Sequence, residues 1–293
     1  MMFYLGIDAG GSNCRARLVN SEGTVSGDGS AGPANIRRGI SAAVSAIEEA
    51  FQKAAFDAGL NDVSLSEISA AIGIAGFSMT EMIDSLRQQL FFSNLKSVTF
   101  VSDGEIANLG AHGGRDGGTV SVGTGAIGII KQGQKLTTLG GHGFPISDLG
   151  SGAYIGLNAL KDTLRAADGL IPETGLTVEI FDIFDNNPRK AITFQDTMAA
   201  ANYAEFTPIV ISHAQKGDYI ANKIMQKSAR HVTELIMAIH RMDVPRISLT
   251  GGLGPVLLSW LDPEVKELLS APLGSPLQGA IGLAKAHPVK IKR

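Results

Sequence analysis

The chain opens with two short apolar stretches separated by a glycine turn. Residues 3–7 are apolar, and Cys14, Ala16 and Leu18 alternate with polar residues after the turn at residues 9–11. Alternation over several positions is typical of a half-buried strand, whereas a short apolar run fits a fully buried one. The pattern therefore predicts a strand, a turn and a second strand over residues 3–19.

The same pattern of strand and glycine turn recurs twice. Residues 119–130 place Gly-Thr-Gly at 123–125 between two apolar stretches, and residues 247–250 run into Gly251-Gly252 before a predicted helix. Successive glycines allow backbone N–H groups to approach an anion with no side chain in the way. The first turn is therefore a candidate phosphate contact, although taken alone it also fits an ordinary hairpin with a glycine bulge.

Periodicity elsewhere predicts a mixed α/β chain. Apolar positions recur at helical spacing or in short buried runs, separated by turn residues. At 293 residues the chain suits two compact domains. The predicted strands cover residues 24–27, 67–76 and 97–102, an irregular loop covers 29–36, and the predicted helices cover 39–58, 178–184, 206–214, 220–242 and 276–285.

Composition narrows the class of protein. Hydrophobic residues make up 44% and charged residues 18%, as in soluble globular proteins, and the formal net charge of −3 gives no electrostatic footprint for nucleic acid or an anionic membrane. The single cysteine, Cys14, cannot form an internal disulfide, and its place in a strand predicts a packed thiol. No apolar stretch is long enough to span a bilayer, and the N-terminus lacks a basic region followed by an apolar run. A cytoplasmic enzyme is the natural interpretation.

Three aspartates stand where strands or glycine turns end. Asp8 precedes the first turn, and a carboxylate among phosphates is tolerable only with a divalent cation between them. Asp103 follows the strand at 97–102, where a carboxylate could accept the proton of an attacking hydroxyl during phosphoryl transfer. Asp148 precedes a glycine-rich helix start. Asp103 and Asp148 could instead be helix N-caps, for which Asp is favoured.

Two common nucleotide motifs are absent from the sequence. Gly-x-Gly-x-x-Gly does not open a helix after a strand, and Gly-x-x-x-x-Gly-Lys-Ser/Thr does not occur. If the protein binds a nucleotide, it therefore does so without a dinucleotide-binding motif or a Walker motif.

The three turns, in this order and over nearly the whole chain, resemble the phosphate-1, phosphate-2 and adenosine motifs of the sugar kinase, Hsp70 and actin superfamily. Ser-Asp-Leu-Gly-Ser-Gly at 147–152 resembles the Gly-Asp-x-Gly-Ser-Gly/Ala motif of the BadF/BadG/BcrA/BcrD-type ATPase family, and within it of the N-acetylglucosamine and glucosamine kinases. Phe-Pro-Ile-Ser-Asp at 144–148 looks closest to bacterial glucosamine kinases.

This resemblance implies an α/β fold of two actin-like (ribonuclease H-like) domains with a nucleotide-binding cleft between them. The first domain would comprise residues 1–117 and a C-terminal helix at about 276–293 that returns to it. The second domain would comprise residues 118–275.

The resemblance also implies the roles of the site residues. Asp103 would be the catalytic base, and Asp8 would orient Mg²⁺, by way of water because Mg²⁺ dehydrates reluctantly. The sugar would contact Asn35, Gly76, Asp103 and Asp148, although Asn35 could also be no more than a helix cap. The ATP contacts would be Gly10, Gly11, Ser12, Thr124, Gly125, Gly251 and Gly252.

The expected function is ATP-dependent transfer of phosphate to the 6-hydroxyl of glucosamine, with N-acetylglucosamine as the alternative acceptor. A free amine prefers carboxylates, whereas an N-acetyl group needs an apolar niche and an amide partner. The expected cofactors are ATP and Mg²⁺, and the partner is a small amino sugar, with a homodimer as the common oligomer.

Two other functions belong to related proteins. Activators of 2-hydroxyacyl-CoA dehydratases hold an iron–sulfur cluster with cysteines at a dimer interface, and one cysteine in the first hairpin does not supply those ligands. Sugar-sensing repressors carry an N-terminal helix-turn-helix and a cysteine-rich zinc motif, neither of which occurs in this sequence.

Overall fold

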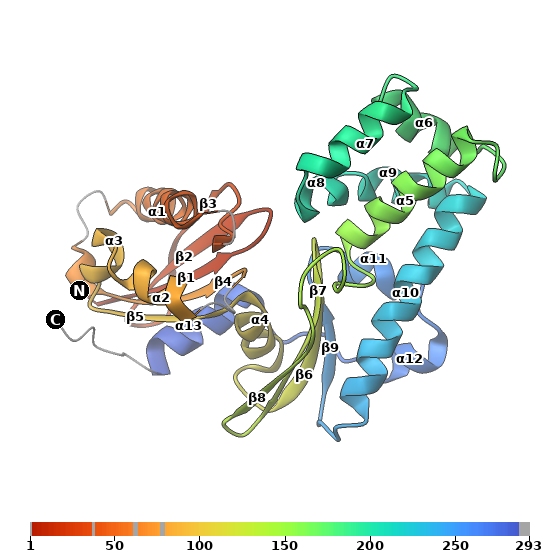
Figure 1. Ribbon diagram of the computed structural model, residues 1–293. Coiled ribbons are helices and arrows are strands. Elements are labelled where there is room, and N and C mark those ends of the chain that lie inside the picture. The colour runs from red at the N-terminus through yellow and green to blue at the C-terminus, as the bar shows by residue number, and fades with distance from the viewer. Residues whose placement is uncertain (1, 37–38, 61–63, 77–79, 287–293) are drawn as a thin grey trace. The chain divides into compact units, whose positions relative to one another are not determined.

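The computed structural model describes residues 2–36, 39–60, 64–76 and 80–286. Two compact units divide these residues between them (Figure 1). Unit 1 comprises the chain up to Gly117, the short segment Lys131–Gln134 and the chain from Ala271 onward, and unit 2 comprises Gly118–Ile130 and Lys135–Ser270. Within the described stretches, no helix combines the length and the apolar character that crossing a membrane requires.

Unit 1 is built on a five-stranded sheet with the strand order β3-β2-β1-β4-β5. β1 pairs antiparallel with β2 and parallel with β4, and β4 pairs parallel with β5. The carboxyl ends of β1, β4 and β5 therefore meet at one edge of the sheet. The strands are β1 (Phe3–Ala9), β2 (Cys14–Asn20), β3 (Val25–Ala31), β4 (Ile68–Ile74) and β5 (Ser97–Ser102).

Helices cover both faces of this sheet (Figure 1). One face packs on the first three helices through residues such as Leu5, Ile72 and Phe92, and the other face packs on the last two through Ala71 and Ala280. Burial on both faces explains why β4 reads as an almost continuous apolar run. The helices are α1 (Ile40–Asp57), α2 (Thr80–Arg87), α3 (Leu90–Ser93), α4 (Asp103–His112) and α13 (Pro276–Ala286).

Two predicted boundaries in unit 1 are wrong. The strand expected at 24–27 continues through Ala31, so the irregular loop begins later than residue 29. Gly27 and Gly29 belong to this strand because it lies directly on α1: a Cβ added at either glycine would meet a carbonyl oxygen of α1 at 2.2 or 2.1 Å. At the start of β4, Leu65–Glu67 forms a 3-10 turn, so the strand begins at Ile68.

Unit 2 contains a four-stranded sheet and a layer of helices (Figure 1). The strand order is β8-β7-β6-β9, with β6 parallel to β9. The strands are β6 (Gly117–Val122), β7 (Ala126–Gln132), β8 (Lys135–Gly140) and β9 (Ile247–Thr250). The helices are α5 (Gly152–Ala167), α6 (Gly175–Ile183), α7 (Pro188–Thr197), α8 (Ala200–Ala204), α9 (Thr207–Gln215), α10 (Tyr219–His240), α11 (Gly254–Leu258) and α12 (Pro263–Glu267).

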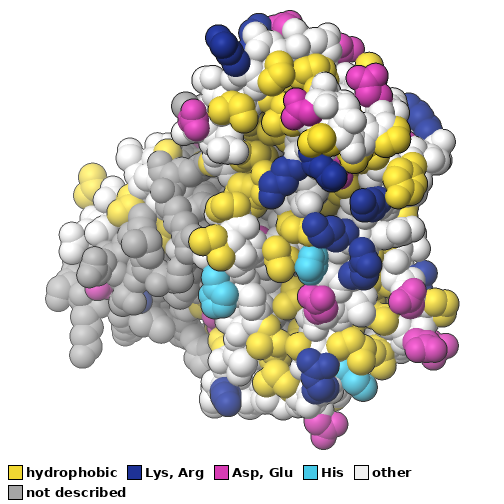
Figure 2. All heavy atoms as spheres, turned by 45° about the vertical axis from the view of Figure 1, so that its right-hand side comes forward, with side chains coloured by type: hydrophobic (Ala, Val, Ile, Leu, Met, Phe, Trp, Pro, Cys, Tyr) yellow, Lys and Arg dark blue, Asp and Glu magenta, His cyan; other side chains and the backbone are white. Residues whose placement is uncertain are grey.

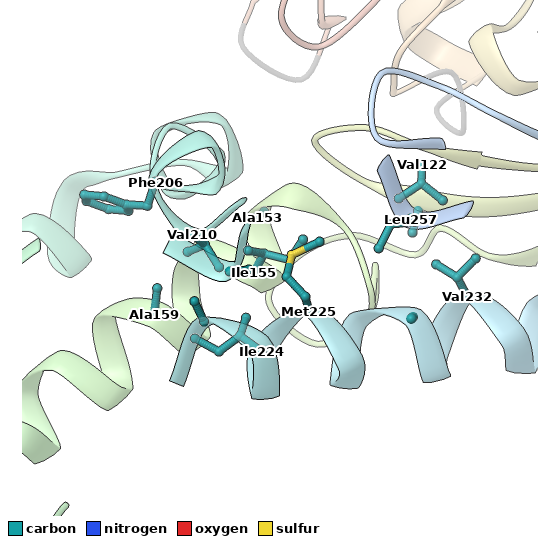
Figure 3. Close-up of a cluster of buried hydrophobic side chains, with 14 of the residues drawn as sticks. Val122, Ala153, Ile155, Ala159, Phe206, Val210, Ile224, Met225, Val232 and Leu257 are labelled. Atoms are coloured by element: carbon teal, nitrogen blue, oxygen red, sulfur yellow. The ribbon is translucent and has the colours of Figure 1, made fainter. Parts of the chain in front are cut away.

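The core of unit 2 joins its sheet to its longest helix. Figure 3 shows Val122 of β6, Ile155 of α5 and Val210 of α9 around Met225 and Val232 of α10. The predicted helix at 220–242 is confirmed as α10, whose apolar positions recur every three or four residues and are buried. Helix α10 therefore packs against β6, α5 and α9 in the same buried cluster.

Helices α4 and α13 of unit 1 meet backbone to backbone. A Cβ added at Gly279 would lie 2.1 Å from the carbonyl oxygen of Ile106, and one added at Gly110 would lie 2.1 Å from the carbonyl oxygen of Ser275. No side chain fits at either position without separating the helices. Gly282 of the same helix is exposed, and its added Cβ meets nothing within 4 Å.

These two glycines of α13 give opposite predictions. Gly279→Ala should lower the free energy of unfolding by about 1–3 kcal/mol, because the methyl group is forced into the backbone of α4. Gly282→Ala should raise it by up to about 1 kcal/mol, since alanine is the better helix former. Urea unfolding of both variants checks this. Equal effects would show that α13 does not pack at Gly279 in solution.

Candidate functional site

Two acidic residues predicted from the sequence lie close together in unit 1. Asp8 is near the carboxyl end of β1 and pairs in register with Gly73 of β4. Asp103 follows β5 directly as the first residue of α4, and a Cβ added at Gly73 would lie 3.2 Å from its Cα. Gly73 is therefore next to both acidic residues: it pairs with Asp8 in the sheet, and it faces the backbone of Asp103 and the side chain of Ile106.

Burial and charge act on the Asp8 carboxyl group. The pKa of Asp8 is raised to about 6, mainly by burial and also by the neighbouring Asp103 carboxylate, while Arg15, its partner across the hairpin, partly offsets the rise. Two carboxylates in a poorly solvated site repel each other, and a cation between them removes that repulsion. The arrangement is suited to a divalent cation.

Serines, rather than these aspartates, cap the helices at the site. The Ser102 hydroxyl accepts the N–H of Glu105 at 3.0 Å, so Ser102 is the N-cap of α4. The Ser151 hydroxyl accepts the N–H of Tyr154 at 3.2 Å and caps α5. Oδ1 of Asp103 accepts the adjacent N–H of Gly104 at 2.9 Å. The alternative that Asp103 or Asp148 is merely an N-cap is therefore wrong.

The first glycine turn and the segment 34–36 are bonded together. Ala34 donates its N–H to the carbonyl oxygen of Gly10 at 3.0 Å, and Ile36 donates to that of Ala75 at 3.3 Å. Asn35, between them, is half-buried, and it does not cap α1, whose N-cap is Gly39. Unit 1 thus brings Asn35 between the first turn and Gly76, next to the end of β4.

The backbone of the first turn is open to a ligand. A Cβ added at Gly11 meets nothing within 4 Å, and Ser12 is exposed. Gly10 donates its own N–H to the carbonyl oxygen of Asn13 at 3.0 Å, which closes the turn. The remaining N–H groups of such a turn can face an anion.

The second glycine turn supports the start of α5 in unit 2. Gly152 and Ala153 donate their N–H groups to the carbonyl oxygens of Gly123 and Thr124 at 2.8 and 3.2 Å. These bonds satisfy helix N–H groups that otherwise have no partner. A Cβ added at Gly125 would lie 3.0 Å from Oδ2 of Asp148. The turn and the Asp148 carboxylate are therefore neighbours, and a side chain at Gly125 would be in tight contact with that carboxylate.

The backbone of Asp148 is strained. Its φ of 61° lies in the left-handed region, which costs a non-glycine residue on the order of 1 kcal/mol. Strain of this kind persists where the surroundings enforce it, and it is concentrated at functional sites.

The third glycine turn lies against the end of β6. A Cβ added at Gly251 would be 2.2 Å from the carbonyl oxygen of Val122, and Leu253 donates to that oxygen at 3.0 Å. Gly252 is exposed with open space around it. Helix α11 follows at once, and a cavity of about 500 Å³ lies between α9 and α11. Its lining residues are Ile211, Gln215, Pro255, Val256, Ser259 and Trp260.

Sequence reasoning missed several parts of the site. Ser102 and Glu105 have the Ser-x-x-Glu spacing of a helix N-terminus, which could have identified the cap. Gly73, between the two acids, and the cavity between α9 and α11 carry no local signal, because both arise from segments far apart in the chain. The structure brings the predicted residues together as two sets, one in each unit.

The described residues contain no group of three or more His, Cys, Asp or Glu side chains arranged to hold a metal ion. Cys14 is fully buried, and burial raises the pKa of its thiol to about 12, so it stays protonated. A protonated thiol is a poor metal ligand.

A family of ATPases and a sugar kinase both match this chain over nearly its whole length. The profile of the BadF/BadG/BcrA/BcrD ATPase family matches residues 5–284. The glucosamine kinase GspK of Vibrio cholerae serotype O1 is 33% identical over 97% of this chain and 96% of its own.

Solved structures agree on the fold. A Chromobacterium violaceum protein proposed to be an N-acetylglucosamine kinase has a TM-score of 0.91 at 28% identity, covering 97% of this chain and 99% of its own. A ROK family glucokinase of Streptomyces griseus, solved with glucose and AMPPNP, has a TM-score of 0.56 at 19% identity, covering 97% and 98%. The fold is that of the actin-like ATPases and sugar kinases, as the sequence predicted.

The raised pKa of Asp8 predicts a pH-dependent stability. Between about pH 4 and pH 6 the folded chain keeps a proton that the unfolded chain has lost, so the free energy of unfolding falls as pH rises through this range. Asp8→Asn removes the ionisable group and with it the loss of stability that its ionisation causes. Without ligand, the variant should be more stable than the parent at pH 7.5, and the gain should vanish near pH 4.

Urea unfolding at both pH values measures the effect. Asp84→Asn, at an exposed acid of the same unit, is the control and should change stability by less than about 0.5 kcal/mol at either pH. An equal gain for Asp8→Asn at both pH values would contradict the prediction.

Proposed function

Because the chain belongs to the BadF/BadG/BcrA/BcrD ATPase family, we propose that it is an ATP-dependent hexosamine kinase that phosphorylates the 6-hydroxyl of glucosamine. The observation that carries this proposal is the pair of carboxylates, Asp8 and Asp103, held beside Gly73 at the carboxyl ends of parallel strands. Phosphoryl transfer to a hydroxyl needs charge neutralisation and a proton acceptor, and two acids with separate roles supply both.

Asp103 is proposed as the proton acceptor. Its helix is capped by Ser102, so its carboxylate is not needed for capping and can face a substrate. The N–H of Gly104 donates to its Oδ1 at 2.9 Å and holds the side chain in one orientation. A positioned general base of this kind contributes about 10²- to 10⁴-fold to the rate.

Asp8 is proposed to orient the metal. The raised pKa reflects a carboxylate whose charge is poorly compensated, and a bound Mg²⁺ would supply the compensation and neutralise charge on the phosphates of ATP. Mg²⁺ is commonly held by one or two carboxylates together with substrate phosphates, so a cage of three protein ligands is not required.

The glycine turns are proposed to hold ATP. Gly10, Gly11 and Ser12 would contact phosphates from unit 1, and Thr124 and Gly125 would contact them from unit 2. The open space at Gly11 supports this role. Gly251 and Gly252 would lie under the ribose. The cavity between α9 and α11 begins directly after this turn, and its volume of about 500 Å³ is ample for a purine base.

The sugar is proposed to contact Asn35, Gly76, Asp103 and Asp148. The first three lie at one edge of unit 1, where small residues and hydrogen-bonded loops leave the backbone accessible. The strained conformation of Asp148 supports a ligand role for its carboxylate. Carboxylates around a 2-amino group favour glucosamine.

N-acetylglucosamine is the second candidate acceptor, and the similarity to the Chromobacterium violaceum protein favours it. An activator of a 2-hydroxyacyl-CoA dehydratase is disfavoured, because Cys14 is buried and its thiol stays protonated. A non-enzymatic sugar sensor would not need a proton acceptor at Asp103.

The first test is ADP release with ATP and Mg²⁺, comparing glucosamine, N-acetylglucosamine, glucose and no sugar. Release that depends on glucosamine is expected. Asp103→Asn should lower kcat by about 10²- to 10⁴-fold while glucosamine still raises the melting temperature. Asp168→Asn, an exposed acid at the end of α5, is the control and should leave kcat unchanged. Sugar-independent hydrolysis, or normal turnover in Asp103→Asn, would overturn the proposal.

The nucleotide contact can be tested separately, because Trp260 is the only tryptophan and lines the cavity. ADP should change its fluorescence without any sugar present. Ser259→Phe, which fills the cavity, should raise the Kd for ADP by about 10-fold or more. Leu258→Phe on the same helix, outside the cavity lining, should leave the Kd unchanged. No difference between these variants would exclude the cavity as the base site.

A further inference from the structure

The loop that carries Asp148 rests on helix α10. The Ser228 hydroxyl, which is fully buried, donates to the carbonyl oxygen of Gly150 at 2.6 Å. Gly150 has a φ of 86°, and a Cβ added there would meet the carbonyl oxygen of Ser228 at 2.9 Å. The loop backbone is therefore in direct contact with α10.

A second contact between α10 and this region joins Tyr154 to His231. The Tyr154 hydroxyl lies 3.1 Å from Nε2 of His231, and the two rings meet edge to face with centroids 5.2 Å apart. Tyr154 is 8% exposed, so its hydroxyl has little access to water. A buried phenol of this kind requires a hydrogen-bond partner, and His231 supplies it.

Glu234 fixes the direction of this hydrogen bond. Its Oε2 lies 3.1 Å from Nδ1 of His231, and an ionised carboxylate can only accept. In the neutral imidazole, Nδ1 therefore carries the proton, and Nε2 is left as the acceptor for the Tyr154 hydroxyl. The three side chains form one directed chain from Tyr154 to Glu234.

Tyr154 is connected to Asp148 by two hydrogen bonds as well as by proximity in sequence. Its N–H donates to the Ser151 hydroxyl at 3.2 Å, and the Ser151 N–H donates to the carbonyl oxygen of Asp148 at 3.1 Å. Holding the Tyr154 ring therefore holds the first turn of α5. Through Ser151, the first helical turn of α5 holds Asp148 in its left-handed conformation, with the carboxylate against Gly125.

The outer side of this cluster is covered by a basic side chain. The Lys227 ammonium lies 5.4 Å from the centre of the Tyr154 ring and donates to Oδ1 of Asn158 at 3.2 Å. Lys and Arg side chains gather on the face of the molecule drawn in Figure 2. Lys227 adds packing over the ring, whereas the hydrogen bond to His231 alone sets where the hydroxyl points.

We propose that His231 is a positioning residue for sugar binding, which acts through Tyr154 to fix the Asp148 carboxylate. This inference rests on the proposed function, because it takes Asp148 as a sugar ligand. Neither His231 nor Tyr154 touches the reacting atoms in this scheme. Loss of their hydrogen bond frees the first turn of α5, and the sugar must then bind a carboxylate that is less well oriented.

The test compares the sugar KM with nucleotide binding in three variants. Tyr154→Phe and His231→Leu should each raise the KM for the accepted sugar by about 3- to 10-fold, the effect of one lost hydrogen bond. The double variant should be no worse than either single one, since both remove the same bond. His231→Gln, whose amide reaches a similar position, should keep the KM near that of the parent. The Kd for ADP, read from Trp260 fluorescence, should stay unchanged throughout.

Matched controls separate positioning from general damage. Tyr219→Phe and His240→Leu make the same changes at exposed positions of α10 and should leave the sugar KM unchanged. An unchanged KM in Tyr154→Phe, or an equal loss of ADP binding, would overturn the inference. If His231→Leu does not fold, Tyr154→Phe and His231→Gln still decide it. Absence of sugar-dependent turnover in the parent would instead refute the proposed function.

Discussion

The carboxylates of Asp8 and Asp103 repel each other, and the sheet of unit 1 has to hold them close together in spite of this repulsion. Asp8 and Asp103 come from different elements, and the backbone bonds of β1, β4 and β5 hold them beside Gly73. Burial first, and the charge of Asp103 second, raise the pKa of Asp8 and make its ionised form unfavourable. The sheet therefore maintains an acidic group whose charge is poorly compensated, and the Mg²⁺ proposed for this site would compensate it.

In unit 2, contacts between backbone segments hold the candidate site residues in place. The start of α5 donates to the carbonyl oxygens of the Gly123–Gly125 turn, and its Asp148 loop rests on α10 through Gly150. At Gly150 the contact needs glycine, because an added Cβ would lie 2.9 Å from the carbonyl oxygen of Ser228. The same first turn of α5 thus supports both a candidate phosphate contact and a candidate sugar contact.

Much of the fold could be predicted from the sequence, because strands buried on both faces and amphipathic helices have clear periods. β1, β4, α1 and α10 were predicted to within a few residues. The strand β3 was cut short because its glycines are unfavourable in strands, and they serve packing on α1 instead. The candidate aspartates were found from their local motifs. Their neighbours, Gly73 and His231, were not, since those contacts join segments far apart in the chain.

The return of α13 to unit 1 has a consequence for folding during synthesis. Unit 2 is almost continuous in sequence, whereas the second face of the unit 1 sheet is covered by α4 together with α13, a helix that begins only at Pro276. A ribosome adding about 5–20 residues per second reaches this helix roughly 9–35 s after it has completed the strands of the unit 1 sheet. During that interval Ala71 and Ile106 lack the contacts with α13 that bury them in the finished chain. The half of the protein that is made first is therefore the half that is completed last, and it is the half most exposed to chaperones and proteases on the way.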